Sequence, residues 1–296
     1  MAPSASKPRT TSRTVATKIG CAPLRAMYET AVEMRPKTWS QIEGDFLRAM
    51  QGFDANVASG VADMGDLQNG KGDFFNDLLA LLLENCADVT LYSRGGVPGL
   101  IFARHQLDVT YPDTGVVQFL LEAKAVGTPK HPGSPKQKPI GRPGSADLEK
   151  RVKEAAFKTI DLKSEYARIQ AERGTSPHGG PGGGSLTTWL RSVKPSSYLF
   201  IAARVVSHND FQRVLAFASI AEQVMDAVGV YCFGPADAQN PTEYESIKVP
   251  VLANQLERVL FRACQDLVAI KSAPTQEPVT PSPATAVPMT EETSED

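Results

Sequence analysis

The sequence predicts a single α/β domain in which helices flank a mixed central β-sheet. Residues 73–86 show the spacing of an amphipathic helix, and short apolar segments that alternate like strands follow up to residue 125. A long charged helix pattern at 147–172 separates these segments from an apolar strand pattern at 197–206. Strand patterns that alternate with helix patterns are typical of helices packed on both faces of a sheet.

The remaining elements follow from the same periodicities. The helical patterns cover residues 22–57, 209–228 and 252–270. The strand patterns cover residues 89–93, 99–103, 106–111, 117–125 and 229–233. A Gly-Gly-Val-Pro-Gly turn separates the first two strands. The predicted order is therefore helix, three or four strands, helix, strand, helix, strand.

One ordered domain is expected over residues 19–271, with insertions at 126–146 and 172–185. The first insertion contains five prolines and the second six glycines. Residues 1–18 carry four bases and no acid, whereas residues 272–296 carry five acids and no base. Both ends are rich in Ser, Thr, Ala and Pro, so disordered tails are expected. The acid-free start also resembles a transit peptide, which is the alternative to a plain tail.

Composition excludes several classes of protein. The net charge of −2 excludes a simple polycation that coats nucleic acid, and no apolar run is long enough to span a membrane. The four cysteines lie far apart without a CxxC pair, so neither a disulfide scaffold nor a cysteine zinc site is expected. We therefore expect a protein of the reducing cytoplasm. Walker A, dinucleotide-binding and nucleophile-elbow motifs are absent from the sequence.

Charged residues interrupt the apolar strand at 117–125. Glu122 and Lys124 are two residues apart, so both emerge on one face of the strand. Asp108 lies between Leu107 and Val109 in the preceding strand. Two carboxylates beside a lysine suit a site for a hard divalent cation such as Mg²⁺, with the ammonium holding an anionic oxygen or an attacking water.

The register of the two strands decides whether the carboxylates meet. A two-residue hairpin at Asp113-Thr114 places Asp108 opposite Phe119, and Glu122 then lies roughly 10 Å away along the strand. A longer loop centred near Gly115 places Asp108 opposite Glu122. We favour the longer loop, because glycine supplies the backbone conformation that such a turn needs.

Asp108 followed by Glu122-Ala123-Lys124 resembles the signature of the PD-(D/E)xK nuclease superfamily. The resemblance covers about residues 73–233 and implies the restriction-endonuclease-like fold. It implies Mg²⁺-dependent hydrolysis of DNA phosphodiester bonds, with Asp108 and Glu122 as metal ligands and Lys124 placing the attacking water. The sequence departs from the pattern at Leu107, where proline is usual. A literal Pro112-Asp113 pair lies in the predicted turn, so Asp113 is the alternative to Asp108.

Many nucleases of this superfamily also use an acid or amide from the helix that precedes the strands. Asn76 follows a phenylalanine at the place where glutamate is frequent, so it is the first candidate for that role. Asp77 and Glu84 on the same predicted helix are the alternatives. The competing interpretation for all three is a solvated helix face without a role in catalysis.

Basic residues concentrate directly after the candidate site. Residues 124–163 hold ten bases and four acids, although the chain as a whole is close to neutral. Such focused charge fits contact with phosphates. The proline-rich loop supplies the predicted DNA-binding residues, which are Lys130, Lys136, Lys138 and Arg142. The competing interpretation is a solvated linker followed by a salt-bridged helix.

The sequence therefore predicts a Mg²⁺-dependent endonuclease that cleaves double-stranded DNA at a specific sequence, as a type II restriction enzyme does. A homodimer is expected, because cutting both strands of a symmetric site needs two active sites. One alternative is a repair or recombination nuclease of the same fold. The other is a non-catalytic DNA-binding protein that keeps the fold.

Overall fold

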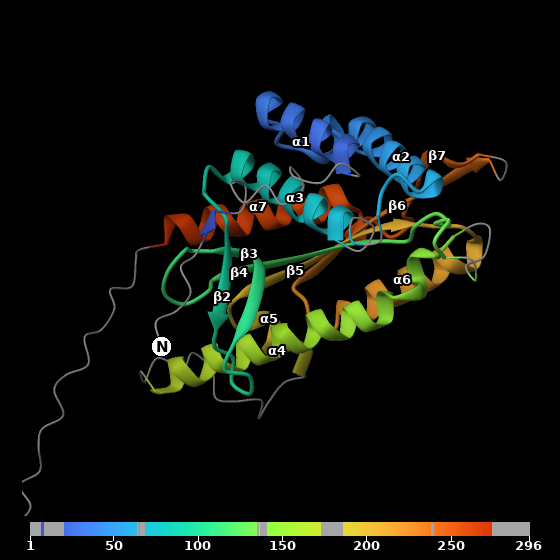
Figure 1. The fold of residues 1–296 in the computed structure, drawn as a ribbon. Helices are drawn as coiled ribbons and strands as arrows, with labels where there is room; N and C mark the ends of the chain where they lie inside the picture. The colour runs from blue at the N-terminus through green and yellow to red at the C-terminus, as the bar shows by residue number, and fades with distance from the viewer. Residues whose placement is uncertain are drawn as a thin grey trace, which may run out of the picture.

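The computed structural model describes residues 7–8, 21–63, 65, 69–134, 136, 141–172, 186–237 and 240–273. A mixed sheet lies between two layers of helices (Figure 1), which confirms the predicted α/β class. Residues 1–6, 9–20 and 274–296 of the expected tails and residues 173–185 of the second insertion lie outside the described residues. Lys7 and Pro8 form a short strand that pairs with a strand of the domain.

The described strands form one sheet in the order β1-β2-β3-β4-β5-β6-β7. The central strands β4, β5 and β6 are parallel, and the β2–β3, β3–β4 and β6–β7 pairs are antiparallel. The strands are β1 (Lys7–Pro8), β2 (Tyr92–Val97), β3 (His105–Tyr111), β4 (Phe119–Val126), β5 (Ser196–Arg204), β6 (Ala227–Asp237) and β7 (Asn240–Ile247).

The helices divide between the two faces of this sheet. Helices α1, α2, α3 and α7 cover one face, and α4, α5 and α6 lie on the other (Figure 1). The α-helices are α1 (Ala22–Met34), α2 (Glu43–Ser59), α3 (Lys71–Ala87), α4 (Leu148–Glu172), α5 (Leu186–Ser192), α6 (His208–Ala221) and α7 (Leu256–Ser272). Short 3₁₀ helices are η4 (Trp39–Gln41), η6 (Gly144–Ala146) and η7 (Leu252–Asn254). Within the described residues, no helix is both long and apolar enough to cross a bilayer.

Side-chain alternation along β4 sorts the core into two halves. Phe119, Leu121 and Ala123 belong to the large core that includes the buried faces of α1, α2, α3 and α7. Leu120 belongs to a separate cluster with Leu162 of α4. Successive side chains of a strand point to opposite faces, so residue 122 faces the α4 layer together with residue 120.

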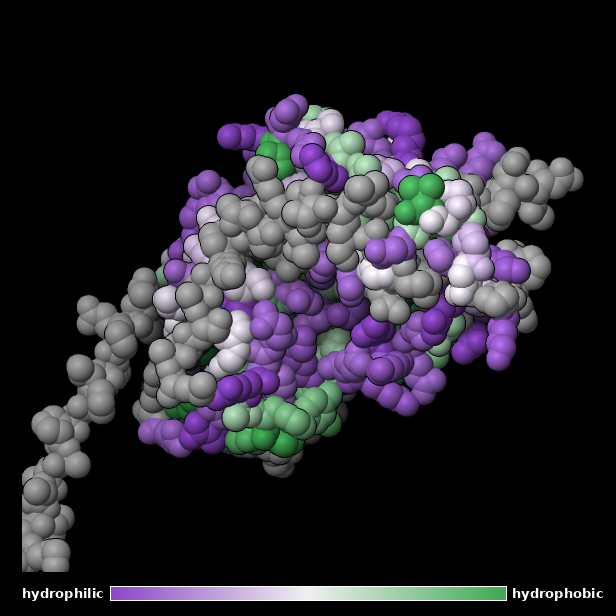
Figure 2. Space-filling view, viewed as in Figure 1, coloured by the Kyte–Doolittle hydropathy of each residue, from purple (hydrophilic) through white to green (hydrophobic). Residues whose placement is uncertain are grey.

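The β2–β3 hairpin bends away from the sheet toward α4 (Figure 1). Residues 92 and 94 of β2 pair with residues 110 and 107 of β3, so β3 contains one extra residue at this point. Such a β-bulge bends a strand and re-aims its side chains. The predicted strand at 99–103 is wrong, because these residues form the turn between β2 and β3. The apolar patch in the lower part of Figure 2 lies over this turn.

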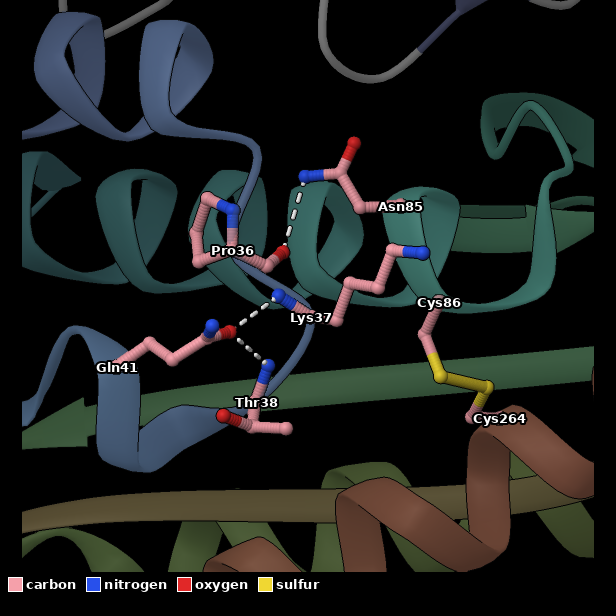
Figure 3. The surroundings of a disulfide bond; sticks show 7 residues. All are labelled: Pro36, Lys37, Thr38, Gln41, Asn85, Cys86 and Cys264. Carbon is pink, nitrogen blue, oxygen red and sulfur yellow. Dashed lines mark hydrogen bonds between the residues drawn. A yellow bond between two sulfur atoms is a disulfide. The ribbon is translucent and has the colours of Figure 1, made fainter.

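A disulfide joins α3 to α7 on the upper layer (Figure 3). Cys86 and Cys264 are 178 residues apart in sequence, and they meet because α3 packs against α7. Asn85 beside them donates a hydrogen bond to the carbonyl of Pro36, so the α1–α2 connection is fixed to the same region. The sequence did not predict this bond, because the two cysteines come together only through the packing of α3 against α7.

A buried network of charged side chains connects α2 and α3 to the ends of strands β4 and β5. The Lys71 ammonium on α3 lies 2.7 Å from an oxygen of Asp54 on α2 and donates to the carbonyl of Gly127 at 3.2 Å. The Tyr244 hydroxyl donates to Asp54 and accepts from Arg204 Nε at 2.9 Å. Burial lowers the pKa of Lys71 against the opposing pull of Asp54. These four residues are called the Asp54 network below.

Candidate active site

Glu122 lies at the centre of the candidate site. Its side chain is only 2% exposed, yet it forms two ion pairs. The Lys124 ammonium lies 2.8 Å from one carboxylate oxygen, and the Lys158 ammonium on α4 lies 2.5 Å from the other. Lys158 also donates to the carbonyl of Gln106 on β3 at 3.0 Å. One carboxylate therefore holds two cations between β3, β4 and α4; Glu122, Lys124 and Lys158 are called the Glu122 cluster below.

Strand and helix periodicities bring this cluster together. Glu122 and Lys124 are two residues apart on β4, so both project toward the α4 layer. On α4, Ala155 and Leu162 are buried at positions three residues before and four residues after Lys158. Lys158 therefore lies on the stripe of α4 that faces the sheet. The lysines remain partly reachable from solvent, with side chains 19% and 20% exposed for Lys124 and Lys158.

The two lysines keep Glu122 ionised. Burial by itself raises the pKa of the Glu122 carboxyl, because a low-dielectric surrounding disfavours charge. The Coulombic attraction of Lys124 and Lys158 and the hydrogen bonds from both outweigh burial, so the pKa lies below its ordinary value. The cluster thus carries one negative and two positive charges, which leaves it attractive to an anion such as a phosphate.

The register of β3 and β4 tests the predicted loop. Val109 pairs with Leu121, Thr110 with Leu120 and Tyr111 with Phe119, and this pairing ends one residue before Asp108 and Glu122. The loop between β3 and β4 spans residues 112–118, and Gly115 has a φ of +70°. The longer loop with Gly115 in the turn is therefore confirmed.

Asp108 falls at the β-bulge of β3. The extra residue lies between the β3 positions that pair with Tyr92 and Arg94, so simple alternation along the whole of β3 is wrong. Leu107 accordingly clusters with Leu120 on the α4 side, whereas Val109 joins the core of the other face. In the part of the chain that the structure describes, the half-buried Asp108 makes no hydrogen bond or ion pair with Glu122.

Asp113 occupies the turn, as the sequence predicts. An oxygen of its carboxylate accepts a hydrogen bond from the Thr114 hydroxyl at 3.4 Å. The Arg94 guanidinium holds the turn by donating to the carbonyls of Pro112 and Gly115 at 3.3 and 3.0 Å. Asp113 lies five residues beyond Asp108, outside the strand that pairs with β4.

The candidates from α3 are not joined to the cluster. Helix α3 packs on the core that contains Leu121 and Ala123, whereas Glu122 contacts α4. Asn76 and Asp77 are buried within α3, and the Asn76 amide oxygen has no hydrogen-bond partner among the described residues. Glu84 accepts a hydrogen bond from the Leu91 amide at 2.7 Å, which fixes the connection into β2. A role of Asn76 in catalysis stays a prediction.

The basic loop leaves β4 at the end away from Glu122. Backbone hydrogen bonds between Thr128 and Arg142 close its base. Thr128 is six residues past Glu122, which is roughly 20 Å at 3.3 Å per residue. Lys136 is exposed, Lys130 is half-buried, and exposed Arg142 pairs with Asp147.

Part of this loop packs on the N-terminal helices. The ring of His131 hydrogen bonds to the carbonyl of Ala62 after α2 at 3.1 Å. Lys138 lies outside the described residues. The hydrogen bonds described for this loop join Thr128 to Arg142 and His131 to Ala62, and neither of these contacts involves the Glu122 cluster.

Sequence reasoning did not assign Lys158 to the site. It lies 34 positions after Lys124 and was counted only as one of many bases in this segment. The available signal was its position on the apolar stripe of an otherwise charged helix, where an ammonium needs a buried partner. A second anchor on α4 was also missed, because the Asp161 carboxylate bonds the ring of His105 on β3 at 2.7 Å.

The donor set fits a magnesium ion that keeps most of its non-protein ligands. Mg²⁺ binds through one or two carboxylates together with water and substrate phosphate oxygens. Glu122 and Asp108 are the two candidate carboxylates, of which the structure brings Glu122 together with two lysines. Among the described residues, no group of three or more His, Cys, Asp or Glu side chains is suited to hold a metal ion. These residues therefore do not form a metal site whose ligands all come from the protein.

Comparisons of the chain with protein-family models, with curated proteins and with solved structures found no match.

Proposed function

We propose that this protein is a Mg²⁺-dependent endonuclease that hydrolyses phosphodiester bonds of double-stranded DNA at a specific sequence. The observation that carries the proposal is the Glu122 cluster on β4 and α4. From α3 to β5 the order is helix, three strands, two helices and a strand, which adds the short α5 to the order that the PD-(D/E)xK resemblance implies. A buried carboxylate that holds two partly exposed lysines suits a phosphate group better than a neutral substrate.

The residues divide the chemistry between them. Asp108 and Glu122 would hold the ion, which when bound polarises the scissile phosphate and lowers the pKa of a water. Lys124 holds the attacking water or a non-bridging phosphate oxygen. Lys158 neutralises Glu122 in the free protein and contacts a phosphate oxygen when DNA is bound.

DNA binding and assembly belong to the same proposal. Lys130, Lys136, Lys138 and Arg142 contact phosphates beyond the cleavage site, at the distance that the loop base sets. A homodimer with a two-fold axis cleaves both strands of a symmetric site. In a restriction system, the protein acts in the cytoplasm, where the Cys86–Cys264 pair would be reduced.

Incubation of the purified protein with plasmid and phage DNA tests the proposal. Discrete fragments are expected in Mg²⁺, none in EDTA, and none from the Lys124→Ala variant. A smear, or preferential cleavage of branched or damaged DNA, would instead favour a repair or recombination nuclease. Tight DNA binding without cleavage in either Mg²⁺ or Mn²⁺ would show a non-catalytic DNA-binding protein.

A further inference from the structure

The tip of the β2–β3 hairpin exposes apolar side chains. Leu100, Ile101 and Phe102 are 50%, 69% and 52% exposed, and Phe157 of α4 is 42% exposed. The rings of Phe102 and Phe157 meet edge to face with centroids 5.3 Å apart. Figure 2 shows an apolar patch over this turn, bordered by hydrophilic surface. These four residues are called the hairpin tip.

The backbone of the hairpin tip is held in place. The buried Asp161 carboxylate accepts hydrogen bonds from the backbone amides of Ile101 and Phe102 at 2.6 and 3.1 Å. Its carbonyl accepts from the Leu100 amide at 3.3 Å, and Gly99 donates to the Phe102 carbonyl at 2.8 Å. The apolar side chains are therefore presented to solvent by a preorganised turn, which lowers the entropic cost of inserting them into a partner.

The hairpin tip is next to the Glu122 cluster. Phe157 directly precedes Lys158, whose ammonium bridges Glu122 and the carbonyl of Gln106. His105, on the other side, has its ring centroid 6.2 Å from that of Phe102. A molecule that covers the hairpin tip therefore lies beside the candidate catalytic carboxylate.

Charge identifies the kind of partner. The hairpin, residues 92–111, contains Arg94, Arg104 and one acid, Asp108, and Lys158 follows Phe157 on α4. An apolar tip beside a small excess of basic residues fits a polyanion with apolar faces, as stacked bases between phosphates are. Four side chains cover less than the roughly 800 Å² per partner that a stable protein interface buries. The patch alone is therefore too small to hold a second copy of the chain.

We propose that the hairpin tip inserts between adjacent base pairs of duplex DNA and unstacks them beside the cleavage site. This inference depends on the proposed function only for the choice of DNA as the ligand. Proteins that insert such apolar wedges partly unstack a base step and kink the duplex. The unstacking cost is smaller at a mismatched pair, so insertion predicts tighter binding to mismatched DNA.

The experiment compares matched and singly mismatched duplexes of otherwise identical, arbitrary sequence. Binding is measured by fluorescence anisotropy in EDTA, so that no cleavage occurs. The wild-type protein should bind the mismatched duplex about tenfold more tightly, which corresponds to about 1.4 kcal/mol. Phe102→Ser and Ile101→Ser should each reduce this preference to less than twofold. Phe261→Ser is the matched control, since Phe261 is 62% exposed on α7 and should leave the preference unchanged.

The outcomes separate this inference from the proposed function. Equal wild-type affinity for both duplexes, or a preference that both hairpin-tip variants retain, overturns the insertion. A wild-type dimer that becomes monomeric in Phe102→Ser, measured by sedimentation, also overturns it and makes the patch a self-association surface. A tip-dependent preference without any cleavage in Mg²⁺ supports the inference and refutes the nuclease. Cleavage in Mg²⁺ without a preference for the mismatched duplex supports the nuclease and refutes the insertion.

Discussion

Two buried clusters of charged side chains in this molecule carry the same charges but differ in their exposure to solvent. The Glu122 cluster and the Asp54 network each contain one carboxylate and two cationic side chains. In the Asp54 network, Asp54, Lys71 and Arg204 are at most 3% exposed, and Tyr244 occupies the remaining side of the carboxylate. In the Glu122 cluster the carboxylate is buried, but about a fifth of each lysine side chain is exposed.

The comparison shows that access, rather than the presence of buried charge, distinguishes a candidate site from a structural network. Partners inside the Asp54 network cannot be exchanged for a ligand without opening the contact of α2 and α3 with the sheet. The Glu122 lysines can turn toward a phosphate while one of them still neutralises the carboxylate. Disrupting the Asp54 network should therefore lower the free energy of unfolding, and disrupting the Glu122 cluster should lower the cleavage rate.

A large loss of activity is expected for Lys124→Ala. Loss of the group that places the attacking water should slow cleavage by about 10²–10⁴-fold, the usual contribution of a positioned proton-transfer or orienting group. Its unfolding free energy should fall by only about 1 kcal/mol, because Lys158 still pairs with Glu122. Single-turnover cleavage and urea unfolding measure the two quantities. A Lys124→Ala protein that cuts at the wild-type rate would remove Lys124 from the chemistry.

Asp54→Ala is the matched variant in the other group. It leaves Lys71 without its buried anionic partner, so the unfolding free energy should fall by about 3–5 kcal/mol. The cleavage rate per folded molecule should stay within about twofold of wild type, since no part of the network reaches the substrate. An Asp54→Ala protein with full stability and no activity would reverse the assignment of the two groups.

Asp108→Asn and Asp113→Asn distinguish a residue in the paired strand from one in the turn. The first should abolish Mg²⁺-dependent cleavage without unfolding the protein, because it removes a proposed metal ligand. The second should change the rate by less than about threefold, because Asp113 lies in the turn, where its carboxylate accepts from the Thr114 hydroxyl. The two rates are compared under saturating Mg²⁺. An inactive Asp113→Asn with an active Asp108→Asn would make the literal Pro112-Asp113 pair the site.

A smaller effect is expected for Lys158→Met. The ammonium competes with a cation for Glu122, and methionine keeps the apolar stem without the charge. Half-maximal cleavage should therefore need about tenfold less Mg²⁺, a modest part of the Coulomb energy between two charges at contact. A Mg²⁺ titration of both proteins gives this ratio. A higher Mg²⁺ requirement in Lys158→Met would show that the lysine supports the ion instead of competing with it.

The smallest effect is on the pH dependence of stability. The folded-state pKa of Glu122 lies below its ordinary value, so the stabilisation is present above the unfolded pKa of about 4.3 and is lost as the pH falls through the folded pKa. Below about pH 4, wild-type stability should therefore fall more steeply than that of Glu122→Gln, by at most about 1.4 kcal/mol per pH unit. Urea unfolding at several pH values measures the two slopes. Parallel curves would mean that Glu122 titrates alike in both states.

The strand pattern was the most informative part of the sequence. Alternation placed Glu122 and Lys124 on one face, and the loop around Gly115 predicted the register in which Val109 pairs with Leu121. The bulge at Asp108 was not predictable, since its only sign is a mismatch of pairing between β2 and β3. Leu100–Phe102 was predicted to be a strand from its apolar residues, because nothing local shows that Asp161, about 60 positions later, holds them as a turn.

Two elements, β7 and α5, were the least predictable. β7 and α5 have neither an apolar alternation nor a long amphipathic stripe, so they are defined by their neighbours rather than by their own residues. Lys158 is likewise placed at the candidate site by tertiary packing, that of α4 against β4. Contacts between residues far apart in sequence are fixed by tertiary packing, which local periodicity does not report.

The link between α3 and α7 turns most of the domain into a covalent ring. Every strand from β2 to β7, and with them Glu122, lies on the closed path between Cys86 and Cys264. A single break of the backbone anywhere along that path opens the ring but leaves one connected molecule, so the two new ends stay attached to the same folded body. Closing a loop of this length removes about 5 kcal/mol of chain entropy from the unfolded protein in the simplest polymer account. With the disulfide intact, the candidate site is therefore carried on a segment that one cut cannot release.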